Sequence, residues 1–299
     1  MKINGTLHCH GGWTDCTTGR FDIERYQRDI QKLADDAIAK GLQLVALTDI
    51  SGKDPTGEIK KGTPFVREIY RPLVNQEYGK PEEDRYDIQV GETSTVLTRK
   101  TDKRQIVFAR TLEVLAEDSH VLIVGTSANI EGNQPLEKVI GEAYKSGGYA
   151  IADHALYPYK MGKGMGEKNV KKFRKKGQLL AVEENANIAW PFEWTGHYNK
   201  KVKELGKKLD MPVIANCDGN SIGQMGRMYT EYEIPEGTPA EQWYDAVIDT
   251  ISSANYSDTR IQRHGKSKGF ISLVRHLIFG LYSQFRARKG WIKQGLPSC

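Results

Sequence analysis

The stretch DIERYQRDIQKLADDAIAKGLQLVALT, residues 22–48, joins an amphipathic helix to a buried strand. Apolar residues recur every three or four positions over residues 22–40, which is the spacing of a helix with one buried face. Gly41 ends this helix, because glycine readily adopts the left-handed conformation found just after helices. Residues 42–48 are nearly all apolar, as in a strand that is covered on both faces. The stretch therefore predicts a helix that leads into a buried strand.

The same alternation of short apolar runs and amphipathic segments recurs along the chain. The expected strands are 3–9, 121–124, 149–152, 179–182 and 212–215, and the expected helices are 136–145, 170–176 and 198–209. Buried strands separated by helices predict a parallel sheet, and about seven such units favour a closed α/β barrel. Residues 94–98 and 104–109 predict a hairpin inserted after a strand at 87–90.

Two regions follow from this pattern, a barrel over residues 1–255 and a basic helical extension over 256–299. The extension carries an apolar stripe over residues 270–285, followed by Arg286, Arg288 and Lys289. We expect this helix to pack on the barrel or on a second copy of the chain. Contact with a membrane surface or a nucleic acid is the alternative.

Composition excludes several classes of protein. The 299 residues are 38% hydrophobic and 27% charged, with 43 Lys and Arg against 38 Asp and Glu. These values exclude a disordered chain, a coiled coil and an integral membrane protein. The net charge of +5 is compatible with an anionic partner without requiring one. The first residues show no signal-peptide pattern and the cysteines are few, so we expect a reducing, cytoplasmic location.

Polar residues that can bind metals stand at the ends of the predicted strands. His8 and His10 are two positions apart, so their imidazoles point to the same side of the first strand. The other residues at such positions are Asp49, Glu92, His120, His154, Glu183 and Asp218. Strand ends converge on one mouth of a barrel, where catalytic residues collect. Imidazole and carboxylate together suit Zn, Mn or Fe.

Five motifs resemble those of the polymerase and histidinol phosphatase (PHP) superfamily. They are LHCHGGWTD (residues 7–15), GLQLVALTDI (41–50), IQVGETS (88–94), IADHALYP (151–158) and ANCDGN (215–220). They follow the order of the family's motifs over about residues 3–222. The resemblance implies a distorted TIM-like (β/α)7 barrel whose metal centre hydrolyses phosphoesters.

The resemblance also implies the metal ligands. One ion would be held by His8, His10, Glu92 and Asp218, and a second by Glu92, His120 and His154. A third site of the family pairs a loop Asp with two histidines. Here Asp15 is present, but Ile50 and Asn220 stand in place of the histidines. Because Ile cannot bind a metal and Asn is a poor ligand for Zn or Mn, we expect two metals and not three.

Two metals would acidify a bridging water, and the resulting hydroxide would attack phosphorus. Asp15, Asp49 and His154 are candidates to protonate the leaving group, and Arg20, Arg227, Lys160 and Lys163 to bind phosphate.

We therefore expect a metal-dependent hydrolase of a phosphomonoester or nucleotide. The alternatives are a 5′-directed nuclease or oligonucleotide phosphatase, a two-metal hydrolase of a non-phosphate bond, and a non-catalytic binding module.

Overall fold

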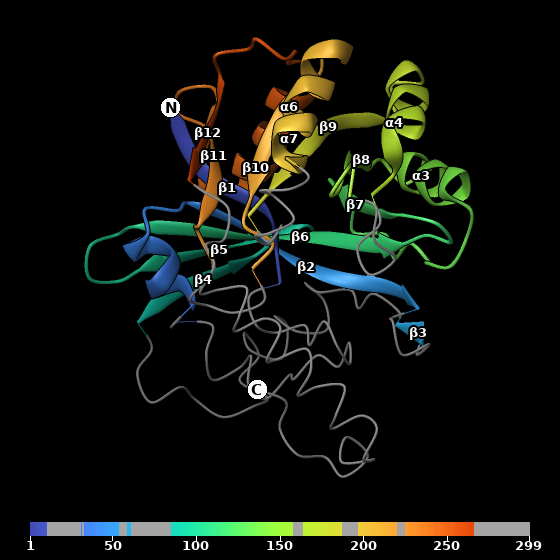
Figure 1. Cartoon of the computed structure of the whole chain (residues 1–299). Helices are drawn as coiled ribbons and strands as arrows, with labels where there is room; N and C mark the ends of the chain where they lie inside the picture. The colour runs from blue at the N-terminus through green and yellow to red at the C-terminus, as the bar shows by residue number, and fades with distance from the viewer. Residues whose placement is uncertain are drawn as a thin grey trace, which may run out of the picture.

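The structure, a computed structural model, describes residues 1–10, 31, 33–53, 59–60, 85–157, 164–186, 197–219 and 225–265. The strands are β1 (Lys2–Cys9), β2 (Leu44–Lys53), β3 (Ile59–Lys60), β4 (Tyr86–Val90), β5 (Ser94–Arg99), β6 (Gln105–Leu115), β7 (His120–Val124), β8 (Tyr149–Ala152), β9 (Leu179–Asn185), β10 (Val213–Asn216), β11 (Met228–Glu233) and β12 (Ile261–Gly265). The helices with assigned bounds are α3 (Leu136–Lys145), α4 (Gly166–Lys175), α6 (Tyr198–Leu209), the short 3-10 helix η3 (Ala240–Gln242) and α7 (Trp243–Ser252). The chain is a mixed α/β protein (Figure 1).

One curved sheet organises the molecule. Its strands follow the order β10-β9-β8-β7-β6-β2-β1-β11-β12. The group β1, β2 and β6 is parallel, and so is the group β8, β9 and β10. Apart from the inserted hairpin, a parallel sheet was expected, and this is wrong at β7, which is antiparallel to both of its neighbours, and at β11 and β12.

The short connection before β7 explains its direction. Only residues 116–119 separate the end of β6 from the start of β7. A parallel crossover needs a dozen or more residues. A link of four residues can therefore only reverse the chain. The start of β7 therefore lies at the same edge of the sheet as the ends of β6 and β8, which places His120 at the mouth.

Hydrogen bonds join the segment around β10, at one end of the sheet, to β1 and β11 near the other end and make the sheet barrel-like. The amide of Leu7 in β1 donates to Asn216 Oδ1 at 2.7 Å, and the amide of Asp218 donates to the His8 carbonyl at 2.8 Å. On the neighbouring strand, Thr230 Oγ1 accepts from the amide of Ala215 at 2.8 Å. These contacts fix the segment that follows β10 beside the end of β1.

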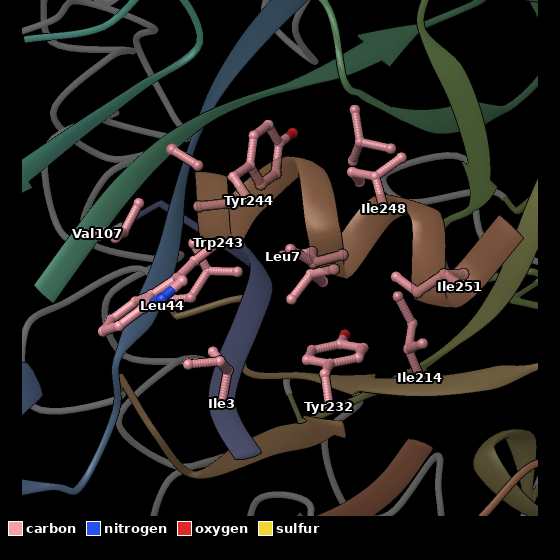
Figure 2. Close-up of a cluster of buried hydrophobic side chains, with 14 of the residues drawn as sticks. Ile3, Leu7, Leu44, Val107, Ile214, Tyr232, Trp243, Tyr244, Ile248 and Ile251 are labelled. Carbon is pink, nitrogen blue, oxygen red and sulfur yellow. The ribbon is translucent and has the colours of Figure 1, made fainter. Parts of the chain in front are cut away.

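Apolar side chains fill the interior at the end of the barrel opposite the mouth. Helix α7 lies across this end, with Trp243, Tyr244 and Ile248 directed at side chains of the surrounding strands (Figure 2). The Tyr244 hydroxyl donates to the carbonyl of Arg110 at 2.8 Å and accepts from the amide of Gly125 at 3.0 Å. With this end closed, the polar side chains are confined to the other.

Helices cover the outer face of the sheet. Helical residues 33–39 pack on β2, β5 and β6, while α3, α4 and α6 pack on β7 to β10. The predicted hairpin is present as antiparallel β5 and β6, with β4 added at its edge. Residues 266–299, with the predicted basic helix, lie outside the described residues, whereas residues 261–265 form β12 of the sheet. No helix of the described part is long and apolar enough to cross a membrane.

Candidate metal centre

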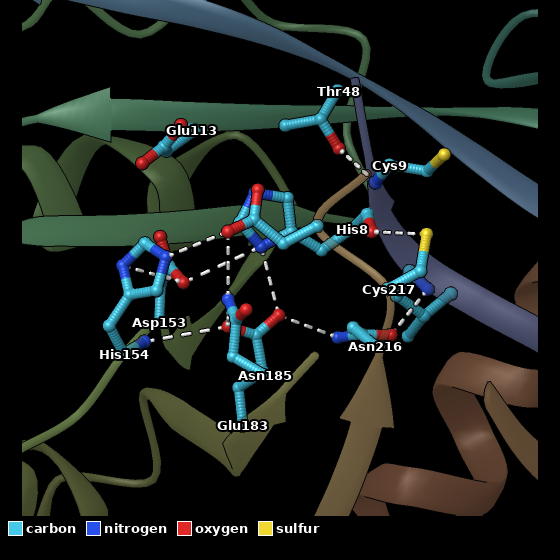
Figure 3. Close-up of polar contacts among 12 residues, drawn as sticks. His8, Cys9, Thr48, Glu113, Asp153, His154, Glu183, Asn185, Asn216 and Cys217 are labelled. Carbon is cyan, nitrogen blue, oxygen red and sulfur yellow. Dashed lines mark hydrogen bonds and ion pairs between the residues drawn. The ribbon is translucent and has the colours of Figure 1, made fainter. Parts of the chain in front are cut away.

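Histidines and carboxylates from five strands meet at the mouth of the barrel. His8 and His10 come from the end of β1, and His120 from the start of β7. Glu113 lies near the end of β6, while His154 and Asp218 follow β8 and β10. The side chains of His8, His10 and Glu113 are less than 7% exposed. Figure 3 shows His8, Glu113 and His154 directed from different strands toward the same region.

Three donor atoms of this group are mutually spaced like the ligands of one metal ion, and a fourth lies at a similar distance from one of them. His8 Nε2 and His10 Nε2 lie 3.2 Å apart. Asp218 Oδ1 lies 3.4 Å from the first nitrogen and 3.3 Å from the second. Glu113 Oε2 is 3.3 Å from His10 Nε2. Ligands about 2.0–2.2 Å from a tetrahedral ion are about 3.3–3.6 Å from each other, so these spacings fit one ion.

A second group of donors shares its carboxylates with the first. Glu113 Oε1 lies 2.7 Å from His120 Nδ1, on the side away from His10. Asp218 Oδ2 lies 3.2 Å from His154 Nε2. Glu113 and Asp218 therefore each present one oxygen to the His8 and His10 pair and the other to the His120 and His154 pair. Carboxylates shared in this way are typical of binuclear sites.

Glu113 takes the place in this cluster that the sequence motifs assign to Glu92. Glu92 lies outside the cluster, in the exposed turn between β4 and β5, where its Oε1 accepts from Ser127 Oγ at 2.8 Å. Strand β4 pairs with β5 at the edge of the hairpin and lies outside the ring of strands that forms the mouth. The end of β4 therefore does not reach the centre.

A turn explains the Gly-Glu pair at 91–92. The amide of Gly91 donates to the Ser94 carbonyl at 2.8 Å, and a Cβ at Gly91 would lie 2.8 Å from that oxygen. Glycine is thus required by the tight turn and does not mark a ligand. The sequence feature that could have identified Glu113 is its position near the end of the buried strand QIVFARTLEVL. An unpaired carboxylate there would cost folding free energy, so an acidic residue at this position indicates a partner.

Hydrogen bonds from behind fix the orientation of two histidines. His8 Nδ1 donates to Glu183 Oε1 at 2.9 Å, and His10 Nδ1 donates to the Thr48 carbonyl at 3.1 Å. Because these acceptors take the proton on Nδ1, Nε2 of His8 and of His10 presents its lone pair to the centre. This is the tautomer that a metal-binding imidazole needs. His154 Nδ1 lies 3.0 Å from Asp153 Oδ1 without a hydrogen bond between them.

Both carboxylate oxygens of Glu183 accept hydrogen bonds. Besides His8, its oxygens accept from Asn216 Nδ2 at 2.9 Å and Asn185 Nδ2 at 3.0 Å. Asn185 Nδ2 also donates to Asp218 Oδ2 at 3.0 Å. Glu183 therefore links the orientation of His8 to that of Asp218, and it acts as a positioning residue behind the donors.

The local electrostatics favour charged forms despite burial. Burial opposes a charge on His8, but the carboxylates of Glu183, Asp218 and Asp153 raise its pKa well above the ordinary value. Burial likewise opposes ionisation of Asp218, but His8, His10 and His154 hold its pKa well below the usual range.

Asp153 behaves differently. Burial raises its pKa well above the ordinary value. Its side chain is fully buried, and neither oxygen has a hydrogen-bond partner among the described residues.

The backbone at two of the donors is strained. His154 has φ 43° and Asp218 has φ 41°, in the left-handed region that side chains with a Cβ rarely adopt. Such conformations cost free energy and concentrate at functional sites. Both residues directly follow a strand or its extension, and the left-handed turn accompanies the entry of their side chains into the cluster.

The donor set fits divalent transition metals. Four carboxylates, those of Glu113, Asp153, Glu183 and Asp218, lie buried with four histidines in one region. So many buried anionic groups are stable only when they are paired or coordinate cations. Mixed nitrogen and oxygen donors suit Zn, Mn or Fe. The buried His, Asp and Glu groups can therefore hold metal ions.

Comparison with known proteins supports the fold. No family model and no curated protein matches the sequence. The crystal structure of PsfC from Pseudomonas syringae PB-5123 matches over 95% of this chain and 98% of its own, with a TM-score of 0.57 and 14% identity. The chain shares its fold with PsfC.

A second solved structure is a weaker match. It is the novel lesion-specific endonuclease PfuEndoQ from Pyrococcus furiosus, with a TM-score of 0.49 and 14% identity. The likeness covers 89% of this chain but only 59% of that one.

The other residues that the sequence analysis singled out are not brought together by the described part of the chain. Asp15, Arg20, Lys160, Lys163, Asn220 and the side chain of Asp49 lie outside the described residues. Ile50 is partly buried in β2, opposite Glu113 in the register. Arg227 is exposed immediately before β11, at the edge of the mouth.

Replacement of Glu183 by Gln tests its positioning role. We expect metal affinity to fall by about 10- to 100-fold, because His8 loses a charged acceptor and the tautomer with Nε2 unprotonated is no longer enforced. Titration of the apo-protein with Co²⁺, followed by its visible absorption, measures both the affinity and the ligand geometry.

Glu184→Gln is the matched control. Glu184 is the next residue in β9, equally buried, but it pairs with Lys203 at 2.8 Å on the outer side of the sheet. This variant should bind Co²⁺ like the wild type. Equal affinities for all three proteins would show that Glu183 does not position the centre.

Proposed function

We propose that the protein is a metal-dependent hydrolase of phosphoesters with a binuclear centre. The observation that carries the proposal is the position of Glu113 at the mouth, where its Oε2 faces His10 and its Oε1 faces His120. The motifs that resemble the PHP superfamily supply the chemistry, since members of that family hydrolyse phosphoesters. On this proposal the sheet is a TIM-like (β/α)7 barrel of the PHP type.

The residues at the mouth have separate tasks. His8, His10, Glu113 and Asp218 would hold one ion, and Glu113, His120 and His154 a second. Two such ions supply Lewis acidity and lower the pKa of water, so that hydroxide forms near neutral pH. Glu183 fixes the imidazole of His8 so that its Nε2 faces the centre.

Proton transfer and phosphate binding fall to other groups in the proposal. Asp15 and Asp49 are the proposed acids for the leaving group, because His154 Nε2 is occupied when it binds a metal. Arg20, Arg227, Lys160 and Lys163 are the proposed phosphate-binding residues. With Ile50 and Asn220 in place of histidines, the centre is proposed to bind two ions and not three.

A screen for phosphoester hydrolysis tests the proposed function. Protein purified without chelator is incubated with phosphomonoesters, nucleotides and short oligonucleotides in the presence of Mn²⁺ or Zn²⁺. We expect hydrolysis of at least one of these classes, detected as inorganic phosphate or as shortened oligonucleotide, and we expect His8→Ala to abolish it. His264→Ala is the control, since His264 stacks on Tyr229 at a centroid distance of 5.0 Å, outside the cluster.

The outcomes separate the alternatives. Metal binding without hydrolysis of any of the three classes would favour hydrolysis of a non-phosphate bond. Failure to bind metal as well would favour a non-catalytic module. Hydrolysis that persists in His8→Ala would refute the assigned centre.

A further inference from the structure

Helices α4 and α6 carry an unusual concentration of positive charge. Together they contain ten Lys or Arg residues and two Glu. This excess of eight exceeds the net charge of +5 of the whole chain, so the remaining residues are net negative. Charge segregated in this way indicates a surface for an anionic partner.

The two helices form one continuous outer face. Lys208 of α6 pairs with Glu167 of α4 at 2.5 Å, and Arg174 Nη2 donates to the Asp210 carbonyl at 3.1 Å. Both helices pack their apolar side chains on the same stretch of sheet. The side chains that point outward therefore belong to a shared surface.

Lysines dominate this surface, and most are not neutralised. The exposed lysines without a carboxylate at ion-pair distance among the described residues are Lys168, Lys171, Lys175, Lys200, Lys201 and Lys207. Lys168, Lys171 and Lys175 are three and four positions apart, so they form one stripe along α4.

This basic face begins at the candidate metal centre. The amide of Gly166, the first residue of α4, donates to the carbonyl of Ala155, the neighbour of His154, at 2.8 Å. Asn199, in the first turn of α6, accepts from the amide of Asn185 at 2.9 Å. From the mouth, each helix runs about 15 Å or more along the outer wall.

We propose that the outer face of α4 and α6 binds the phosphate backbone of a nucleic acid, one end of which reaches the metal centre. The inference rests on the proposed function for the reaction at that end, but binding along the helices needs no metal. A length of about 15 Å corresponds to about four phosphates of one strand. A lone phosphomonoester would contact only the mouth.

Among the described residues, α4 and α6 expose no large apolar side chain, and this argues against a protein or a membrane as the anionic partner. The apolar side chains of both helices, such as Val170, Phe173 and Leu205, are buried against the sheet. Within the described part, the large apolar side chain that is exposed is Tyr144 of α3. Protein interfaces need apolar or aromatic anchors, and membrane-surface helices need apolar residues that enter the bilayer. Phosphate-backbone binding needs only the charges.

Equilibrium binding tests the proposal independently of catalysis. The full chain is titrated in EDTA with a fluorescent 20-nucleotide dT strand, and anisotropy is measured from 50 to 200 mM salt. We expect saturable binding that weakens steeply with salt. Reversal of three charges in Lys168→Glu/Lys171→Glu/Lys175→Glu should weaken binding at least tenfold and reduce the slope of log K against log salt by about 2.

A second triple variant is the control for net charge. Lys103→Glu/Lys138→Glu/Lys145→Glu reverses three exposed lysines that lie outside α4 and α6 and should bind within about threefold of the wild type. Equal losses in both variants, or no loss in the first, would overturn the proposal. So would equally tight binding to anionic phospholipid vesicles or to polyglutamate. Failure to hydrolyse any phosphoester, with strand binding intact, would refute the proposed function alone.

Discussion

Replacement of Glu113 by Gln is expected to lower metal-dependent hydrolysis by about a thousandfold or more and to reduce the metal content of the protein. The carboxylate faces His10 with one oxygen and His120 with the other. An amide of the same size can offer only one neutral oxygen, and its NH2 group would face an imidazole. Loss of a direct ligand should exceed the 10- to 100-fold cost of losing an outer contact.

Glu92→Gln provides the matched control, because the same chemical change is made in the exposed turn between β4 and β5. Activity and metal content should stay within about twofold of the wild type. Steady-state rates and elemental analysis of both variants measure the difference. If Glu92→Gln were the damaging change and Glu113→Gln the silent one, the ligand assignment from the sequence motif would be right and that from the structure wrong.

Removal of metal is expected to lower the melting temperature by about 10 °C or more. An ion that binds only the folded state stabilises it by about 4 kcal/mol at a thousand times its Kd. For a chain of this size, 1 kcal/mol shifts the melting temperature by about 2–4 °C. Without metal, the carboxylates of Glu113 and Asp218 also remain buried in one cluster, with no metal ion to offset their negative charge. Thermal melts before and after dialysis against a chelator measure the shift.

The double variant His8→Ala/His10→Ala is the control for this experiment. The chelator should lower its melting temperature less than that of the wild type, because the first ion loses two of its four ligands. Superimposable melting curves for the wild type in both conditions would contradict the metal-stabilised centre.

Much of the fold follows from periodicity in the sequence. The expected helices at 136–145 and 198–209 coincide with α3 and α6, and the strand at 149–152 coincides with β8. These elements each have one clear apolar face or run. Strand direction is not encoded in that pattern, so β7 was expected to be parallel. Its direction follows from the link after β6, which is only four residues long. The apolar pattern does not show where β6 ends, and so it does not give the length of this link.

The candidate site was predictable where ligands immediately follow strands. His8, His10, His154 and Asp218 were expected together from their positions at strand ends, and the structure brings them together. Glu113 was missed because the Gly-Glu pair at 91–92 fits a motif better, although a turn requires that glycine. The acceptors behind the histidines, such as the Thr48 carbonyl, depend on neighbouring strands and leave no mark in the sequence.

Anomalous diffraction from crystals grown with Mn²⁺ or Zn²⁺ tests the binuclear centre most directly. We expect two peaks at the mouth, one bound by His8, His10, Glu113 and Asp218 and the other by Glu113, His120 and His154. Both ions should contact Glu113, each through a different oxygen. A single peak, peaks that do not contact Glu113, or a metal bound by Glu92 would contradict the account.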